Sequence, residues 1–275
     1  MKSAFKNTLR NWLPPIFVRW LIKLKNAGNR FYGDYATWEE AEEKCSGYSA
    51  EKILEKVLAS TIKVKNGDAV YERDSVIFNH IEYSWPVLTA LMWAAARQSG
   101  RLNVIDFGGS LGSSYFQNRI FLQSIPQVNW SVVEQSHYVE AGQKHIQFEN
   151  LKFYKTIDEC TDEHQPNVIL LSSVLQYLRD PIDIVTKLTA TKATLLIIDR
   201  TPFSSLDLDK ILIQKVPSSI YSASYPMRVF SRQKFLEELK CDWELIAECV
   251  SPEGNIKSTA GIEFTFQGMI LGLKN

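Results

Sequence analysis

The sequence predicts an α/β fold with a mostly parallel sheet, preceded by a helical N-terminal cap. After Gly100, short β-branched apolar runs alternate with helical stretches, at spacings of roughly 20–30 residues. Each spacing leaves room for one crossover helix, as in βαβ units. The last two runs flank a loop with Pro252 and Gly254, which predicts a closing hairpin. The seven predicted strands are residues 102–107, 130–134, 151–154, 168–171, 194–199, 243–250 and 262–273.

The residues before Gly100 predict helices instead. Apolar side chains recur at helical spacing over residues 38–44 and 50–64, with Gly47 between the two runs. A third helix is predicted over residues 86–100, because Pro86 suits the first turn of a helix. These helices form the predicted cap on the sheet.

Composition narrows the classes of function. The chain has 275 residues, is 45% hydrophobic and 23% charged, and carries a formal net charge of zero, so no global field attracts nucleic acid. The four cysteines are scattered and no histidines cluster, which argues against a metal site or a disulfide framework. A reducing, cytoplasmic location is therefore expected.

A glycine-rich loop follows the first predicted strand of the sheet. The strand ends in Asp106, and the small residues that follow let the backbone turn tightly beneath a ligand. A helix begins next, so its free N–H groups point toward the loop. An acidic residue two positions before the first glycine is typical of loops that bind S-adenosylmethionine (SAM). The small residues of the loop are Gly108, Gly109, Ser110 and Gly112.

Two further strand ends carry polar groups. Glu134, followed by Gln135, ends the second strand 28 residues after Asp106. A carboxylate there can accept hydrogen bonds from both hydroxyls of a ribose. Ser172 and Ser173 end the fourth strand, at the edge where open α/β sheets bind ligands. The three strand ends together predict a nucleoside site.

These motifs resemble the cofactor motifs of class I SAM-dependent methyltransferases. More narrowly, segments 31–35, 71–74, 82–86 and 198–203 resemble a family of bacterial methyltransferases often associated with surface-polysaccharide gene clusters. The resemblance covers roughly residues 30–275. It implies a Rossmann-like sheet, SAM as cofactor and a glycan-related acceptor. Ser110 departs from the pattern, because most class I enzymes have a glycine there.

The sequence divides into three predicted regions, of which the first lies outside the resemblance. Residues 1–30 form a basic amphipathic segment, residues 31–100 a helical cap that covers the substrate, and residues 101–275 the SAM-binding domain. The residues predicted to bind the cofactor are Asp106, Gly108, Gly109, Ser110, Gly112, Glu134, Gln135, Ser172 and Ser173.

The acceptor side offers several candidate residues. Methyl transfer to a hydroxyl requires a base, whereas a phosphate or carboxylate acceptor requires only cations to hold it. The candidate bases are His80, Glu82 and Asp199. These residues also have plain structural explanations. His80 would suit an ordinary position on the surface, and Arg73 beside Glu72 or Asp74 would suit an ordinary ion pair. The residues predicted to contact the acceptor are Tyr71, Arg73, Tyr83, Gln176, Tyr177, Arg200, and Tyr221, Tyr225 and Arg228 of a predicted loop over residues 216–231.

Two other functions compete with the methyltransferase. A short-chain dehydrogenase requires a Tyr-x-x-x-Lys motif after its glycine loop, and the match at Tyr48 and Lys52 lies before it. NAD-dependent oxidoreduction is therefore disfavoured. A protein of the same fold without catalysis, acting as a scaffold in glycan assembly, stays open.

The N-terminal segment has an unusual charge pattern. Residues 1–30 hold seven lysines and arginines and no acidic residue, interleaved with Trp12, Phe17 and Trp20. The apolar run is too short to span a bilayer. Such a segment suits peripheral contact with an anionic membrane. The same residues would also suit a helix packed on the cap, with lysine and arginine reaching solvent.

Overall fold

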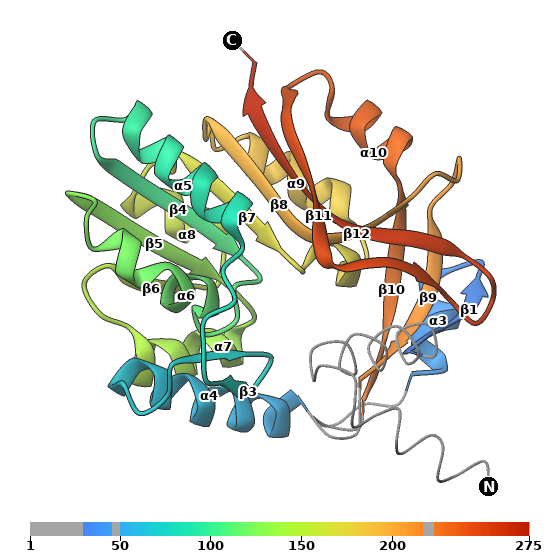
Figure 1. Cartoon of the computed structure of the whole chain (residues 1–275), viewed down its shortest axis with the longest axis horizontal. Coiled ribbons are helices and arrows are strands. Elements are labelled where there is room, and N and C mark those ends of the chain that lie inside the picture. The colour runs from blue at the N-terminus through green and yellow to red at the C-terminus, as the bar shows by residue number, and fades with distance from the viewer. Residues whose placement is uncertain (1–29, 46–49, 217–222, 275) are drawn as a thin grey trace, which may run out of the picture.

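A twisted sheet runs through the whole computed structural model, which describes residues 30–45, 50–216 and 223–274 (Figure 1). Within these residues the sheet has ten strands, in the order β1-β9-β10-β8-β7-β4-β5-β6, while β12 pairs with β8 and β11 with β12. The strands are β1 (Phe31–Tyr35), β4 (Arg101–Phe107), β5 (Gln127–Val133), β6 (Leu151–Tyr154), β7 (Val168–Ser172), β8 (Leu195–Ser204), β9 (Lys210–Lys215), β10 (Ser224–Ser231), β11 (Trp243–Lys257) and β12 (Glu263–Leu273).

The main part of the sheet is parallel. Strands β6, β5, β4, β7 and β8 pair in parallel, and β12 then pairs antiparallel with β8. Strand β11 completes the hairpin with β12. This is the seven-stranded Rossmann-like sheet with an antiparallel last hairpin that the sequence predicts, and each predicted strand overlaps an observed one.

Helices cover both faces of this sheet. Their bounds are α3 (Trp38–Glu43), α4 (Ala50–Asn66), α5 (Trp85–Arg97), α6 (Ser113–Leu122), α7 (Ser136–Ala141), α8 (Ile157–Glu163), α9 (Pro181–Thr189) and α10 (Arg232–Leu239), with the short turns η2 (Gly142–Ile146) and η3 (Leu175–Tyr177). Side-chain caps begin several of them: the Thr37 hydroxyl accepts from the amide of Glu40, and the Thr156 hydroxyl from the amide of Glu159.

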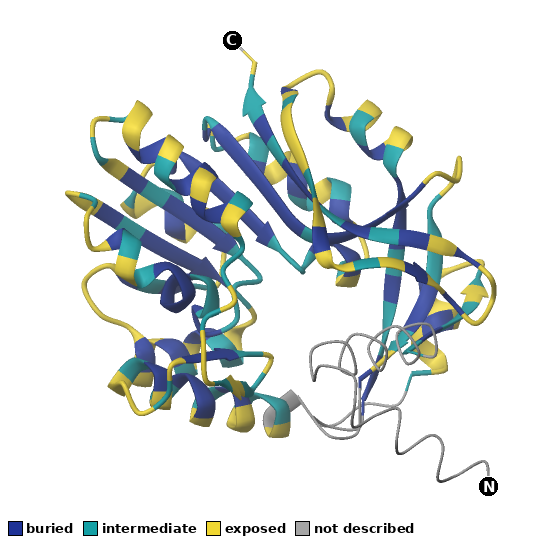
Figure 2. Cartoon of the chain, in the orientation of Figure 1, coloured by how far each residue is buried: buried dark blue, intermediate teal, exposed yellow. Residues whose placement is uncertain are grey.

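Alternate residues of the central strands enter two different cores. These strands are buried over most of their length (Figure 2). Val104 packs in the core beneath α4, α5 and α6, whereas the next residue, Ile105, packs in the core with α9 and α10. Because both faces are covered, the strands appear in the sequence as continuous apolar runs.

The other strands form a smaller accessory part with its own core. Strand β9 pairs antiparallel with β1 and with β10, and β10 joins β8 at Phe230 and Ser231. The outer half of the β11–β12 hairpin packs against these strands, and Phe264 contacts Phe31 with ring centroids 5.3 Å apart. The accessory part therefore joins the main sheet at the end of β8, where β10 pairs with it.

The structure corrects the sequence analysis in two segments. Residues 216–231 are predicted as a loop, but residues 224–231 form strand β10; Tyr221 lies outside the described residues. Residues 31–100 contain the three predicted helices, but also strand β1 and a hairpin of β2 (Tyr71–Arg73) and β3 (Val76–Phe78). Among the described residues, no helix is long and apolar enough to cross a bilayer.

Candidate cofactor and acceptor site

The glycine loop connects β4 to α6 through left-handed backbone. Gly108, Ser110 and Gly112 have φ angles of 70°, 54° and 86°. Glycine adopts this region freely, whereas a residue with a Cβ is strained in it by about 1–2 kcal/mol. Ser110 therefore adopts a backbone conformation that glycine would adopt without strain, at a conformational cost.

Asp106 lies beneath the loop. Its side chain is buried, and Oδ2 accepts a hydrogen bond of 3.0 Å from the indole of Trp130. A Cβ on Gly109 would stand 2.5 Å from the carboxyl carbon of Asp106, so the close contact requires glycine there. Burial raises the pKa of Asp106 to about 7, an effect that the Trp130 hydrogen bond partly opposes.

Glu134 contacts the same loop from the end of β5. Its Oε1 accepts from the amide of Ser110 at 3.2 Å, and its Oε2 accepts from the amide of Gln135 at 2.8 Å. Burial raises the pKa of Glu134, while both hydrogen bonds lower it. Each carboxylate oxygen keeps a further lone pair, so Glu134 has the capacity to accept two hydroxyls of one diol. The side chain of Gln135 itself is exposed.

A β-bulge shapes the end of β8. Ile198 pairs with Met269 and Thr201 with Gln267, so Asp199 and Arg200 together oppose Gly268. Arg200 adopts a φ of 49° within this bulge. Bulges re-aim side chains next to functional sites, and here the bulge turns two consecutive charged residues toward Ser172.

Asp199, Arg200 and Ser172 form one hydrogen-bonded group. The Ser172 hydroxyl donates to Asp199 Oδ2 at 2.8 Å, and Arg200 Nη2 donates to Ser172 Oγ at 3.1 Å. Arg200 Nε lies 3.3 Å from Asp199 Oδ2, and the Ser84 hydroxyl donates to Asp199 Oδ1 at 3.3 Å. The Asp199 carboxylate thus contacts Ser172, Arg200 and Ser84. Arg200 is the cationic member of this group.

Gln176 supports this group from below. It is fully buried, and its Nε2 donates to Ser173 Oγ at 3.1 Å and to the carbonyl of Arg200 at 3.3 Å. Ser173, just after β7, has a φ of 58°, and Arg200 of β8 is also left-handed. The side chain of Gln176 therefore hydrogen-bonds to two residues with left-handed backbone. Gln176 is therefore held inside the protein, and its contact with an acceptor stays a prediction.

The other candidate bases lie on the surface. Glu82 pairs with Arg73 at 3.4 Å and lies 3.6 Å from His80, whose side chain is 67% exposed. Tyr83 packs beside Trp85 and Phe121. Only Ser84 of this segment reaches Asp199 among the contacts of the described residues.

Three of the acceptor candidates are tyrosines, and they lie on different elements: Tyr71 on β2, Tyr177 in η3 and Tyr225 on β10. Tyr71 is buried; burial raises its pKa, and the positive charges of Arg73 and Arg200 partly offset the effect. Tyr177 donates to Gln214 Oε1 at 2.7 Å and its ring lies 6.5 Å from that of Tyr225. Tyr177 and Tyr225 thus connect the end of the main sheet to the accessory strands, whereas Tyr71 lies on the β2–β3 hairpin beside Phe78.

Arg228 points away from the accessory core, on the face of β10 opposite to Met227. Its guanidinium lies 3.5 Å from Asp209, donates to the carbonyl of Arg179 at 2.9 Å, and stands over the Trp38 ring of α3. The neighbouring Met227, by contrast, packs in the accessory core. The structure thus separates Arg228 from the other acceptor candidates.

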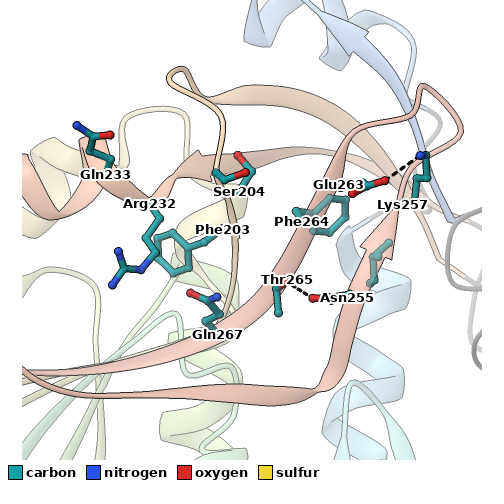
Figure 3. A pocket seen from close by; sticks show the side chains of 12 residues that line it. Phe203, Ser204, Arg232, Gln233, Asn255, Lys257, Glu263, Phe264, Thr265 and Gln267 are labelled. Atoms are coloured by element: carbon teal, nitrogen blue, oxygen red, sulfur yellow. Dashed lines mark hydrogen bonds and ion pairs between the residues drawn. The ribbon is translucent and has the colours of Figure 1, made fainter.

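A cavity of about 680 Å³ lies elsewhere, between the end of β8, the start of α10 and the β11–β12 hairpin (Figure 3). Its charged lining residues are already paired: Lys257 with Glu263, and Arg232 with Glu248. Among the described residues, the lining includes none from the glycine loop or the end of β5. We therefore do not place a charged cofactor there.

Comparisons with known proteins give remote similarities. No protein-family model matches the chain, and no curated protein matches it. One similar structure is the N-terminal domain of EvdMO1 in the presence of SAH and D-fucose, at 13% identity over 83% of this chain and 98% of that chain, with a TM-score of 0.47.

Two other similar structures are enzymes from named bacteria. One is the Burkholderia thailandensis 1,6-didemethyltoxoflavin-N1-methyltransferase, at 14% identity over 84% of this chain and 92% of that chain, with a TM-score of 0.41. The other is CalS10 of Micromonospora echinaspora, an amino pentose methyltransferase, at 10% identity over 70% and 93%, with a TM-score of 0.44. Similarity this remote leaves the function to be argued from the site.

Proposed function

We propose that the protein is a SAM-dependent methyltransferase. The observation that carries the proposal is the carboxylate of Glu134, which the end of β5 places against the glycine loop at the amide of Ser110. A carboxylate with two free acceptor positions beside a tight loop and a helix N-terminus suits an adenosine with an amino-acid tail. The strand order and the bulge at Asp199 and Arg200 support an acceptor site at the same edge of the sheet.

The charge of the site favours a cationic ligand. Glu134 and Asp106 border the loop, and burial raises the pKa of both carboxyl groups. A positively charged ligand would favour their ionised forms. When bound, SAM would supply an electrophilic methyl carbon: an acceptor atom would attack this carbon in line, the carbon–sulfur bond would break, and S-adenosylhomocysteine would leave with the bonding electrons.

Replacing Glu134 tests the proposal. We expect Glu134→Ala to weaken binding of S-adenosylhomocysteine about tenfold to a hundredfold, because a charged hydrogen-bonded group is worth about 1.5–3 kcal/mol. Isothermal titration calorimetry measures the affinity. The control is Glu140→Ala on α7, where the glutamate pairs with Lys155 on the surface. Unchanged affinity in Glu134→Ala, or binding of NAD in place of S-adenosylhomocysteine, would contradict the proposal.

For the acceptor we propose a hydroxyl, phosphate or carboxylate of a sugar or glycan precursor. Arg200 supports this class, because its guanidinium stands beside Ser172 at the edge of the sheet and suits an anionic or polar acceptor. Tyr177 and Tyr225 offer rings for a sugar face. Transfer of labelled methyl from SAM to extract-derived acceptors separates an enzyme from a scaffold protein of the same fold.

Arg200 should act on turnover more than on cofactor binding. We expect Arg200→Ala to lower kcat/KM for the acceptor about tenfold to a hundredfold, because it removes a charged contact of about 1.5–3 kcal/mol. The affinity for S-adenosylhomocysteine should change little. Steady-state kinetics and calorimetry measure the two effects. Loss of cofactor binding with an unchanged acceptor KM would place Arg200 in the cofactor site instead.

We also propose that residues 1–30 contact an anionic membrane from the cytoplasmic side. The support is their composition, seven cationic residues and no acidic one around tryptophans; residues 1–29 lie outside the described residues. In liposome flotation with anionic vesicles at low salt, the full chain should float and a variant lacking residues 1–25 should not. Equal and poor flotation of both would rule out this contact.

A further inference from the structure

The turn of the β2–β3 hairpin presents a carboxylate that the sequence offers only as an ion-pair partner for Arg73. Arg73 and Val76 are the last paired residues of the hairpin, and Asp74 and Ser75 form the turn between them. Both turn residues have left-handed backbone, with φ angles of 53° and 68°, as in the type I′ turns of tight hairpins. Asp74 is exposed, whereas Glu72 is buried, so Asp74 is the accessible carboxylate of this hairpin.

Contacts on both sides of the turn hold the hairpin against the main part. The Glu72 carboxylate accepts a hydrogen bond from the hydroxyl of Ser113, which directly follows the glycine loop. The Ser60 hydroxyl of α4 donates to the carbonyl of Ser75 at 2.8 Å. Asp74 is two residues from Glu72, which corresponds to about 7 Å along a strand. The turn therefore lies close to the end of the glycine loop.

The charge of Asp74 acts on groups from three other elements at the same edge of the sheet. Burial raises the pKa of Tyr177 in η3 to about 12, and the charge of Asp74 is the next cause. Burial also raises the pKa of Tyr138 in α7, and the charge of Asp74 adds to the effect. Burial lowers the pKa of Arg200 in β8, but the charges of Asp199 and Asp74 contribute to a net rise. Because charge interactions weaken with distance, Asp74 lies among the ends of β5, β7 and β8. The titratable groups on which its charge acts are Tyr71, Glu72, Tyr138, Tyr177 and Arg200.

Asp74 differs from the other carboxylates near this edge in having no fixed partner. Both oxygens of Asp199 accept hydrogen bonds, and so do both oxygens of Glu72. Glu82 pairs with Arg73. In the part of the chain that the structure describes, no lysine or arginine forms an ion pair with Asp74. An accessible carboxylate without a fixed partner is suited to take a proton from a hydroxyl within hydrogen-bond reach. Its charge also disfavours an anionic acceptor at this edge.

We propose that Asp74 is the general base of the reaction and that the acceptor group is a hydroxyl. The inference rests on the proposed function, since it assumes methyl transfer from SAM at this edge of the sheet. A carboxylate oxygen of Asp74 takes the hydroxyl proton while the acceptor oxygen forms its bond to the methyl carbon. The electrons of the carbon–sulfur bond leave with S-adenosylhomocysteine, so the products are a methyl ether and a protonated Asp74. This narrows the proposed acceptor, because a phosphate or carboxylate requires no base.

Two variants of Asp74 test this inference. The probe is the extract fraction that receives labelled methyl from SAM in the presence of the unaltered protein. Asp74→Asn keeps the size of the side chain, and asparagine tolerates left-handed backbone. We expect it to lower kcat roughly a hundredfold to ten-thousandfold, the usual contribution of a general base. Its affinity for S-adenosylhomocysteine, measured by calorimetry, should change little. Between about pH 7 and pH 9 its rate should rise toward that of the unaltered protein, since hydroxide then takes the proton. Asp74→Gly should recover activity when formate is added as a replacement base.

The chemistry of the product tests the acceptor class separately. We expect the label in a methyl ether of a sugar, which resists mild alkali and is identified by mass spectrometry after hydrolysis. Release of the label as methanol in mild alkali would show a carboxylate acceptor. Label on a phosphate would show an acceptor that needs no base. Either of these two products overturns the inference while the proposed methyltransferase stands.

Asp162→Asn is the matched control, because Asp162 is exposed near the end of α8 and should leave rate and affinity unchanged. An unchanged rate in Asp74→Asn would overturn the inference. A lower rate that neither pH nor formate restores would assign Asp74 a structural role and also overturn it. Loss of S-adenosylhomocysteine affinity in proportion to the rate would move Asp74 to the cofactor site, with the same consequence. If the unaltered protein binds no S-adenosylhomocysteine and labels no fraction, the proposed function itself fails.

Discussion

At the scale of single residues, the site depends on carboxyl groups whose environment opposes their ionisation. Asp106 has a pKa near 7 in the folded chain because it is buried, against an ordinary value of 3.8. Between these two values the folded state holds a proton that the unfolded state has lost. The stability that this proton contributes is complete below about pH 4 and is lost as the pH rises through about 7.

This linkage predicts the pH dependence of an Asp106→Asn variant. Asparagine can still accept the Trp130 hydrogen bond but does not titrate. Between pH 5 and 8, the free energy of unfolding of the ligand-free protein should fall relative to that of the variant, by roughly 1–4 kcal/mol. Urea unfolding at four pH values measures the difference. Parallel stability curves for the two proteins would show that Asp106 ionises normally.

Sequence reasoning finds a site residue when its position on an element defines its role. Glu134 directly follows an apolar strand, so its location at the edge of the sheet is predictable. The buried position of Glu72 is not predictable in this way, because its side chain accepts a hydrogen bond from Ser113, 41 residues further along the chain. Gln176 follows β7, as the sequence predicts, but only the fold shows that its side chain is buried.

At the scale of elements, strands with two buried faces are the most predictable. Strands β4 to β8 are continuous apolar runs, since helices cover both sides of the sheet. Strand β10 is different, because it contains Pro226, which favours a loop in a sequence. The structure accommodates this proline: among the described residues, β10 pairs with β8 only at Phe230 and Ser231, so no strand there requires an amide at residue 226 on that side.

The bulge in β8 depends on Gly268 of β12. A Cβ at this position would lie 2.7 Å from Cys249 Sγ and 3.1 Å from the carbonyl oxygen of Ile198. We expect Gly268→Ala to destabilise the protein by about 1–3 kcal/mol through overpacking, measured by urea unfolding. Adding Cys249→Ala should recover part of the loss, since the contact with the Ile198 carbonyl persists.

Gly272→Ala is the control on the same strand. Its Cβ would contact the Ile246 side-chain end at 2.9 Å, and Ile246 is 47% exposed and free to move aside. This variant should be destabilised much less than Gly268→Ala. Similar losses at both positions would mean that the bulge has no special steric requirement for glycine.

At the scale of the whole molecule, two long strands connect the main and accessory parts. Strand β8 pairs with β7 over residues 195–199 and with β10 at residues 203–204. Strand β12 pairs with β8 from Gly272 to Thr265, and its outer end contributes Phe264 to the accessory core. The amide of Thr259 in the hairpin also donates to the carbonyl of Phe31. Tyr177 and Tyr225 lie at this junction, so their positions depend on both parts being folded.

Shared strands predict that both parts unfold together. Phe264 is buried in the accessory core, and Phe264→Ala should lower the free energy of unfolding by about 3–5 kcal/mol. Because β12 contributes to both cores and β8 pairs with strands of both parts, protection from hydrogen exchange should fall by the same amount in β9 and β10 as in β4 and β5. Phe235→Ala, in the main core, should produce the same uniform loss. Selective loss of protection in β9 and β10 after Phe264→Ala would instead show that the accessory part opens on its own, and cofactor binding would then survive a change that abolishes acceptor turnover.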